Sequence, residues 1–243
     1  MTDIAIAGST EMTDVDAMLA KKAAAMRENI KTSTSLISVT KAGQIQLPDK
    51  SLVDEVDLVV LDYRYRNVYY SAPWREGEYT EAECFAIGES HNDTLVPLET
   101  SPKKQCDTCK ACEWNQFGSH PMGRGKKCQN QFLIAAVRPD ADESEILLLK
   151  ASPTAVALVA PYMLRMADMH GHPIKVITTF GVDMTKTYAR LKADFQAPNP
   201  NYAAHAQLLV DAERAVTSPP FVATSDDQKE STGVKASGRK ARA

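Results

Sequence analysis

Five cysteines carry the clearest chemical signal in this chain of 243 residues, and all of them lie between positions 84 and 128. Cys106, Cys109 and Cys112 form two overlapping C-x-x-C units that share Cys109. A C-x-x-C turn places two thiolates at neighbouring corners of a tetrahedron, so a zinc ion would need two more ligands from elsewhere in the chain. Cys84 and Cys128 are the obvious candidates for those two positions.

Other chemistry stays open for the same cysteines. C-x-x-C-x-x-C also begins ferredoxin-type iron–sulfur motifs, although no proline-marked fourth cysteine adjoins it here. His91 or His120 could replace one cysteine ligand, but a lone loop histidine is more often solvated. Ordinary buried or free thiols are the remaining alternative. A disulfide framework is disfavoured, because the cysteine count is odd and the chain begins without an export signal.

The cysteines stand in a segment that has little else to fold around. Between residues 71 and 127, proline, glycine, serine, asparagine and charged residues dominate, with almost no periodic apolar pattern. That length is abnormal for a plain loop in a compact domain. Metal binding can supply the folding free energy that a missing hydrophobic core does not. The sequence therefore predicts an insertion at about 84–128 that a bound Zn²⁺ ion holds together.

The flanking sequence predicts the elements that position this insertion. Alternating or continuously apolar runs indicate strands, whereas capping residues with helical periodicity indicate helices. The predicted strands cover 36–40, 44–48, 56–70, 131–137, 145–150, 174–180 and 188–195. The predicted helices cover 14–30, 152–171 and 202–216. This is a mostly β chain with peripheral helices, in the α+β class.

Composition sets the domain plan and excludes some classes of protein. A chain of this length with 44% hydrophobic residues fits one elaborated domain with tails. We expect a helical arm at 1–34, a domain at 35–221 and a disordered tail at 222–243. No stretch approaches the ~18 apolar residues of a membrane span, so we expect a soluble, intracellular protein without a membrane partner. The 28 basic and 31 acidic residues give a net charge of −3, so any argument for nucleic acid must rest on local clusters.

One local cluster follows the predicted strand at 56–70, where tyrosines alternate with arginines. Single-stranded DNA is held by stacking on aromatic faces, worth about 1 to 3 kcal/mol per base, and by basic residues along the phosphates. Regular alternation would put Tyr63, Tyr65 and Tyr69 on one face and Arg64 and Arg66 on the other, apart from a local bulge. Core packing of the tyrosines is an equally good interpretation.

A second cluster surrounds the cysteines, where six basic residues outnumber two acidic ones at 103–128. Gly123 and Gly125 would let the backbone approach phosphate closely. Trp114 could stack on a base or pack on the metal loop, and we expect Phe117 to pack as its apolar plug. The candidate nucleic-acid contacts in both clusters are Arg64, Tyr65, Arg66, Tyr69, Trp74, Arg75, Lys110, Trp114, Arg124, Lys126 and Lys127.

The cysteine segment also resembles a known family. Residues 109–119 and 123–128 fit the pattern C-x-x-C-x-x-N-x-F-G-S followed by G-x-G-K-x-C, with an earlier cysteine upstream. This pattern is similar to that of bacteriophage single-stranded DNA-binding proteins, and the similarity extends loosely over about 40–195. The resemblance implies an oligonucleotide-binding (OB) β-barrel with a zinc-bearing insertion. It implies Cys84, Cys109, Cys112 and Cys128 as the zinc ligands and leaves Cys106 spare.

The resemblance further implies a protein that coats single-stranded DNA during replication or recombination, in the cytoplasm of an infected host cell. Replication or recombination proteins are the expected protein partners, with a homo-oligomer as an open alternative. One departure is the tail, which is basic at Arg239, Lys240 and Arg242, where such proteins often end in an acidic tip. That difference weakens a role in recruiting other replication proteins.

Two rival functions and one negative expectation complete the sequence-based hypotheses. A zinc-ribbon module that binds a host or phage protein would use the same cysteines, as would an iron–sulfur protein. We expect no enzyme, because the sequence offers no convincing Ser-His-Asp set, phosphate-binding glycine loop, paired metal-binding carboxylates or H-E-x-x-H motif. His170 and His172 resemble a metal pair, but most such pairs are surface residues.

Overall fold

The computed structural model describes residues 36–72, 81–121, 123, 125–140 and 145–218. The helical arm predicted at 1–34 and the tail predicted at 222–243 lie outside these residues. The candidate contacts Trp74, Arg75 and Arg124 lie outside them as well.

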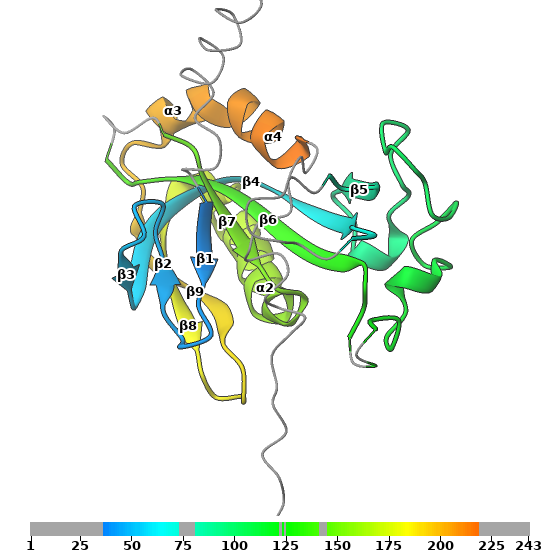
Figure 1. Cartoon of the computed structure of the whole chain (residues 1–243). Helices are drawn as coiled ribbons and strands as arrows, with labels where there is room; N and C mark the ends of the chain where they lie inside the picture. Colours follow the sequence, from blue (N-terminus) through cyan, green and yellow to red (C-terminus); the bar gives the residue numbers. More distant parts are fainter. Residues whose placement is uncertain (1–35, 73–80, 122, 124, 141–144, 219–243) are drawn as a thin grey trace, which may run out of the picture. The chain divides into compact units, whose positions relative to one another are not determined.

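A curled, open β-sheet forms the frame of the described residues (Figure 1). Its strands are β1 (Leu36–Val39), β2 (Ile45–Gln46), β3 (Leu52–Val53), β4 (Glu55–Tyr69), β5 (Cys84–Gly88), β6 (Gln129–Val137), β7 (Leu147–Ala151), β8 (Val176–Asp183) and β9 (Arg190–Pro198). They run in the order β3-β2-β1-β7-β6-β4-β8-β9, and β5 pairs with β4 beside that path. The sheet is a half-barrel with few helices, which confirms the mostly β, α+β class.

Strand β4 pairs with three other strands of the sheet. Its first residues, 55–58, pair with β8, and its last residues, 65–69, pair with β5. Strand β6 runs antiparallel to residues 59–68 of β4. One long strand therefore connects the half-barrel to the segment that carries the cysteines.

A β-bulge in β4 changes which side chains face the core. The register against β6 shifts between Val60 and Asp62. Before the bulge, Leu58 and Val60 lie in the main core, whereas after it Tyr63 and Tyr65 pack against that core. A bulge adds one residue to one strand, so the alternation of faces inverts beyond it. The two tyrosines thus share a face, as predicted.

Helices cover both faces of the sheet. Helix α2 (Pro153–His170) begins after Ser152 and ends at Gly171, whose φ of 82° is the left-handed conformation that glycine adopts most readily. Its apolar side packs in the main core against β6, β7 and β9. The last helical stretch is divided into α3 (Tyr202–His205), the 3-10 turn η4 (Ala206–Leu208) and α4 (Leu209–Thr217). Helix α4 packs on the opposite face, against β4 and β6.

Most of the predicted elements are confirmed within the described residues. The described elements that were not predicted are β3, β5 and three short 3-10 turns, namely η1 (Asn92–Thr94), η2 (Glu113–Asn115) and η3 (Pro173–Lys175). Strand β5 was not predicted, because its five residues lie in an otherwise polar segment. It is defined by its pairing with β4, and a pattern within one segment does not reveal such a partner.

Candidate metal centre and nucleic-acid surface

All five cysteines line one small cavity beside β4 and β5. The cavity has a volume of about 10 Å³, and Asn67, Tyr69 and Asn115 also line it. A space of this size holds roughly one water-sized sphere. All five cysteines are free thiols, and four are buried while Cys106 is half-buried. The fold therefore gathers at one point residues that lie far apart in the sequence.

Backbone hydrogen bonds fix the cysteines that come from different elements. Cys84 begins β5 opposite Tyr69 of β4. The Cys109 N–H donates to the Leu95 carbonyl at 2.9 Å, and the Cys128 N–H donates to the Trp114 carbonyl at 2.8 Å. Cys128 then leads directly into β6. Each of these cysteines is thus anchored at its main chain to a neighbouring segment.

The surroundings of the cavity disfavour thiolates unless a cation is present. Burial raises the pKa of Cys84 and Cys109 and raises that of Cys128 well above its usual value, and the neighbouring thiols add to each effect. Burial and a hydrogen bond with Cys112 raise the pKa of Cys106 to about 12. A divalent cation would reverse this balance, because it favours deprotonated sulfur by direct ligation.

The five thiols suit a metal ion that prefers sulfur ligands, although their side chains do not surround a position for such an ion. Among the described residues, no group of three or more His, Cys, Asp or Glu side chains is arranged to hold a metal ion as it stands. For a common site, the shared cavity is stronger evidence than the present directions of the side chains. Neutral thiols pack like small apolar side chains, and they must turn toward a cation to bind it. Thiolates select copper(I), zinc or iron–sulfur clusters. The donor set is therefore of a kind that these metal groups take, zinc among them.

The histidines considered as ligands lie elsewhere. His91 and His120 do not belong to the lining of the cysteine cavity in the part of the chain that is described. The His91 ring accepts a hydrogen bond from the Asp93 N–H at 3.3 Å. Among the other histidines, His172 accepts from the Ile174 N–H at 3.1 Å, and His170 stacks on Phe195 with ring centroids 5.9 Å apart. Their contacts are those of capping and packing residues.

An aromatic pair covers the cavity. The Tyr69 ring stacks on Trp114 with centroids 5.3 Å apart and an interplanar angle of 27°. The Lys127 Nζ lies 5.3 Å from each of the two ring centroids. Tyr69 is buried in one cluster with Cys84 and Cys128, and Trp114 packs against that cluster. In this conformation Tyr69 and Trp114 shield the thiols, and Tyr69 presents almost no ring surface to a base.

The two candidate arginines of β4 are engaged within the protein. Arg64 is 11% exposed and forms ion pairs with Asp62 at 2.6 Å and with Glu89 and Glu213 at 3.4 Å. Arg66 donates from Nε and Nη2 to the Gln131 Oε1 at 3.0 and 2.8 Å. A phosphate would have to compete with these partners for either guanidinium.

Tyr63 and Tyr65 form a half-buried aromatic row on the curled face. Their ring centroids lie 5.2 and 4.9 Å from that of the buried Phe132. The exposed His91 extends the row, with its ring centroid 5.9 Å from that of Tyr65. This row combines the two roles that the sequence left open, because its rings pack on the core and keep part of their surface in solvent.

The tip of the insertion is more exposed than predicted. Phe117 is 79% exposed, so the expectation that it packs as an apolar plug is wrong. Tyr69 and Trp114 take that place over the cavity. Next to Phe117, Gly118 has a φ of 93° and no heavy atom within 4 Å of the position that a Cβ would occupy. The tip is therefore an open, glycine-bearing turn with an aromatic ring in solvent.

The basic candidate contacts of the insertion differ in the bonds that they form within the protein. Lys110 is exposed beside the cysteine turn. Lys126 lies 3.4 Å from the Asp93 carboxylate and donates to the Asn115 side chain at 3.3 Å. Lys127 donates to the Ser71 carbonyl at 3.1 Å in addition to its ring contacts. The structure thus brings Tyr69, Trp114, Lys126 and Lys127 around the cysteine cavity, whereas Arg64, Tyr65 and Arg66 lie along β4.

Sequence reasoning missed a set of buried asparagines beneath this surface. No role was predicted for Asn67, Asn92 and Asn130, which are buried and linked by hydrogen bonds through Asn67. A sequence signal existed for Asn115, which is a fixed position of the pattern C-x-x-C-x-x-N-x-F-G-S.

No protein-family model, curated protein or solved structure matches this chain. Among the described residues, no helix combines the length and the apolar character needed to cross a membrane.

Proposed function

We propose that this protein binds single-stranded DNA through its cysteine-bearing insertion and the adjoining face of the half-barrel. The observation that carries the proposal is the exposed Phe117 ring at the tip of a glycine-rich, basic segment. Bases stack on aromatic faces irrespective of sequence, and lysines along the strand neutralise phosphates. The half-buried Tyr63 and Tyr65 supply a second aromatic surface on the curled face.

The proposal includes a structural zinc ion and an OB-type barrel. Cys84, Cys109, Cys112 and Cys128 would hold the ion, because these four are the buried members of the cysteine set. Bound zinc would supply folding free energy to the insertion and no reaction chemistry. The curled half-barrel is compatible with an OB-type barrel, an architecture that binds oligonucleotides. In this proposal the protein coats DNA during phage replication or recombination in the cytoplasm of the host cell.

The test is a fluorescence-anisotropy titration of the zinc-loaded protein with a labelled oligo-dT strand at low and high salt. We expect binding at low salt that weakens as salt rises, with a logarithmic slope of about −0.7 for each phosphate contacted. A labelled duplex of the same length is the matched control and should bind more weakly. Absence of oligo-dT binding at low salt would overturn the proposal.

A second candidate is a zinc-bearing module that binds a host or phage protein. It is favoured by the engagement of Arg64, Arg66 and Lys127 inside the molecule, which leaves fewer cations for phosphates. A protein that contains zinc, is folded and ignores oligo-dT at low salt would favour this candidate over DNA binding.

A further inference from the structure

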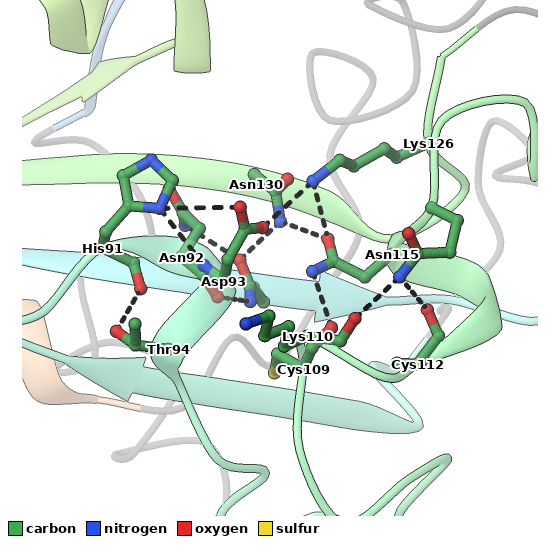
Figure 2. A network of polar contacts seen from close by, with 12 residues as sticks. His91, Asn92, Asp93, Thr94, Cys109, Lys110, Cys112, Asn115, Lys126 and Asn130 are labelled. Carbon is green, nitrogen blue, oxygen red and sulfur yellow. Dashed lines mark hydrogen bonds and ion pairs between the residues drawn. The ribbon is translucent and has the colours of Figure 1, made fainter.

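Four buried asparagines form a continuous hydrogen-bonded network between the sheet and the cysteine turn (Figure 2). Asn67 belongs to β4, Asn92 to η1, Asn115 to η2 and Asn130 to β6. Their exposed fractions are 1, 3, 3 and 8%, in that order. A buried amide without a hydrogen-bond partner destabilises the fold, so such a network tolerates few other arrangements.

The network connects the sheet to Cys109 through Asn130, which donates to both Asn67 and Asn115. The Asn67 Oδ1 accepts from Asn92 at 2.8 Å and from Asn130 at 2.5 Å. Asn130 also donates to the Asn115 Oδ1 at 2.8 Å. The Asn115 Nδ2 then donates to the Cys109 carbonyl at 2.8 Å. Four side chains thus tie the main chain of Cys109 to two central strands.

Gln116 and the Asn115 main chain add further hydrogen bonds to the turn at residues 109–112. The Gln116 Nε2 donates to the Lys110 carbonyl at 2.8 Å and to the Cys112 carbonyl at 3.1 Å. The Asn115 N–H also donates to the Cys112 carbonyl, at 3.1 Å. Residues 109–112 are therefore held at the main chain.

This arrangement matches what a metal ligand requires of its surroundings. Partners behind the ligands orient them, and loss of such a partner typically lowers metal affinity by about 10- to 100-fold. Asn115 bonds the main chain of Cys109 through its side chain and that of Cys112 through its N–H, whereas Cys106 is half-buried. Because Cys109 belongs to both C-x-x-C units, the added hold on Cys112 is the physical reason for the chain to use the 109–112 unit rather than the 106–109 unit.

We propose that Asn115 is a positioning residue that fixes the 109–112 turn to β4 and β6, so that Cys109 and Cys112, rather than Cys106 and Cys109, form the C-x-x-C pair that ligates the metal ion. This inference rests on the proposed zinc site.

The first test compares cobalt affinity in Asn115→Ala and in a matched control, Asn199→Ala. Asn199 is also buried, and its Nδ2 donates to the Ile174 carbonyl at 2.7 Å, outside the cysteine network. Co²⁺ is added to each metal-free protein, and affinity is measured by competition with a chromophoric chelator. We expect about a 10- to 100-fold loss for Asn115→Ala and less than a twofold change for Asn199→Ala. Equal affinities of wild type and Asn115→Ala would overturn the inference.

The second test asks whether Cys106 takes a ligand position when the network is cut. Cys106→Ser should leave cobalt affinity and the thiolate-to-cobalt absorption unchanged in the wild-type background. In the Asn115→Ala background the same change should lower affinity further and weaken that absorption. A null effect of Cys106→Ser in both backgrounds would overturn the proposed choice of ligand. Failure of wild type to bind cobalt or zinc would overturn the zinc proposal itself, which separates the two failures.

Discussion

The main core and the cysteine-bearing insertion differ in what fills them. Between the curled sheet and helix α2, the buried side chains are aliphatic and aromatic, with Phe132, Ile134 and Phe180 among the largest. The insertion at 84–128 instead buries thiols and amides, and cysteines are members of two of its small apolar clusters. The first region can fold by hydrophobic burial, whereas the second depends on polar bonds and, in our proposal, on zinc.

Metal removal should produce the largest difference between the two regions. Structural zinc binds with about 10 to 16 kcal/mol of apparent free energy in small zinc-finger peptides. We expect a strong chelator to make 84–128 sensitive to limited proteolysis, while the far-UV circular dichroism of the sheet persists. Peptide mapping by mass spectrometry locates the cleavages. Cleavage first within β6–β9 would contradict this division of the molecule.

Phe180→Ala should damage the half-barrel with or without metal. Phe180 is fully buried in the main core and pairs with Val56 across β8 and β4. Truncation of a buried phenylalanine costs about 3 to 5 kcal/mol. Urea unfolding followed by circular dichroism should show this loss in both the zinc-loaded and the chelator-treated protein. A loss below about 1 kcal/mol would mean that the core repacks or contributes little.

Phe117→Ala should weaken DNA binding without changing stability. The ring is 79% exposed, so its removal takes little apolar surface from the folded protein. Loss of one stacked base should cost about 1 to 3 kcal/mol, which corresponds to roughly 5- to 150-fold in the dissociation constant. Oligo-dT anisotropy measures the effect.

The control for Phe117→Ala is Tyr188→Ala. Tyr188 is 48% exposed between β8 and β9, which Figure 1 places away from the insertion. It should leave affinity unchanged. Equal losses for the two variants would indicate nonspecific contacts in place of a stacking site at the tip.

The smallest expected effect is on the pH dependence of folding stability, through Asp183 where β8 leads into the β8–β9 connection. Hydrogen bonds from the Thr185 backbone and side chain, with help from Arg190, lower the pKa of Asp183 from 3.8 to about 2. Because the folded-state pKa is depressed, the stabilisation is complete above about pH 4 and is lost as pH falls toward 2. We expect Asp183→Asn to lower the thermal midpoint slightly at pH 6, with the difference from wild type shrinking by pH 2.5. A difference that grows at low pH would contradict this assignment.

The elements that depend on local patterns were predictable from sequence. Helix α2 has Ser152 and Pro153 at its start and Gly171 at its end, and β6 and β7 are short apolar runs around a turn. Strand β5 was not predictable in this way, because its five residues are organised by pairing with the far end of β4.

The gathering of the cysteines was predictable from sequence, whereas the packing around them was less so. The density of cysteines indicated a common location, and all five line one cavity. The prediction that Phe117 packs over the thiols was wrong, because sequence cannot tell which of two nearby aromatic residues does so. Trp114 takes this position together with Tyr69. The asparagine network was missed because asparagine in a polar segment usually indicates a turn.

Metal analysis of purified protein tests the central claim most directly. Zinc per chain is measured by inductively coupled plasma mass spectrometry in wild type, Cys84→Ser and Cys106→Ser. We predict one zinc ion in wild type and in Cys106→Ser and none in Cys84→Ser, because Cys84 is a buried member of the proposed ligand set and Cys106 is the half-buried spare. Wild type without zinc, or with iron and a visible absorption band near 400 nm, would contradict the account, as would equal zinc in the two variants.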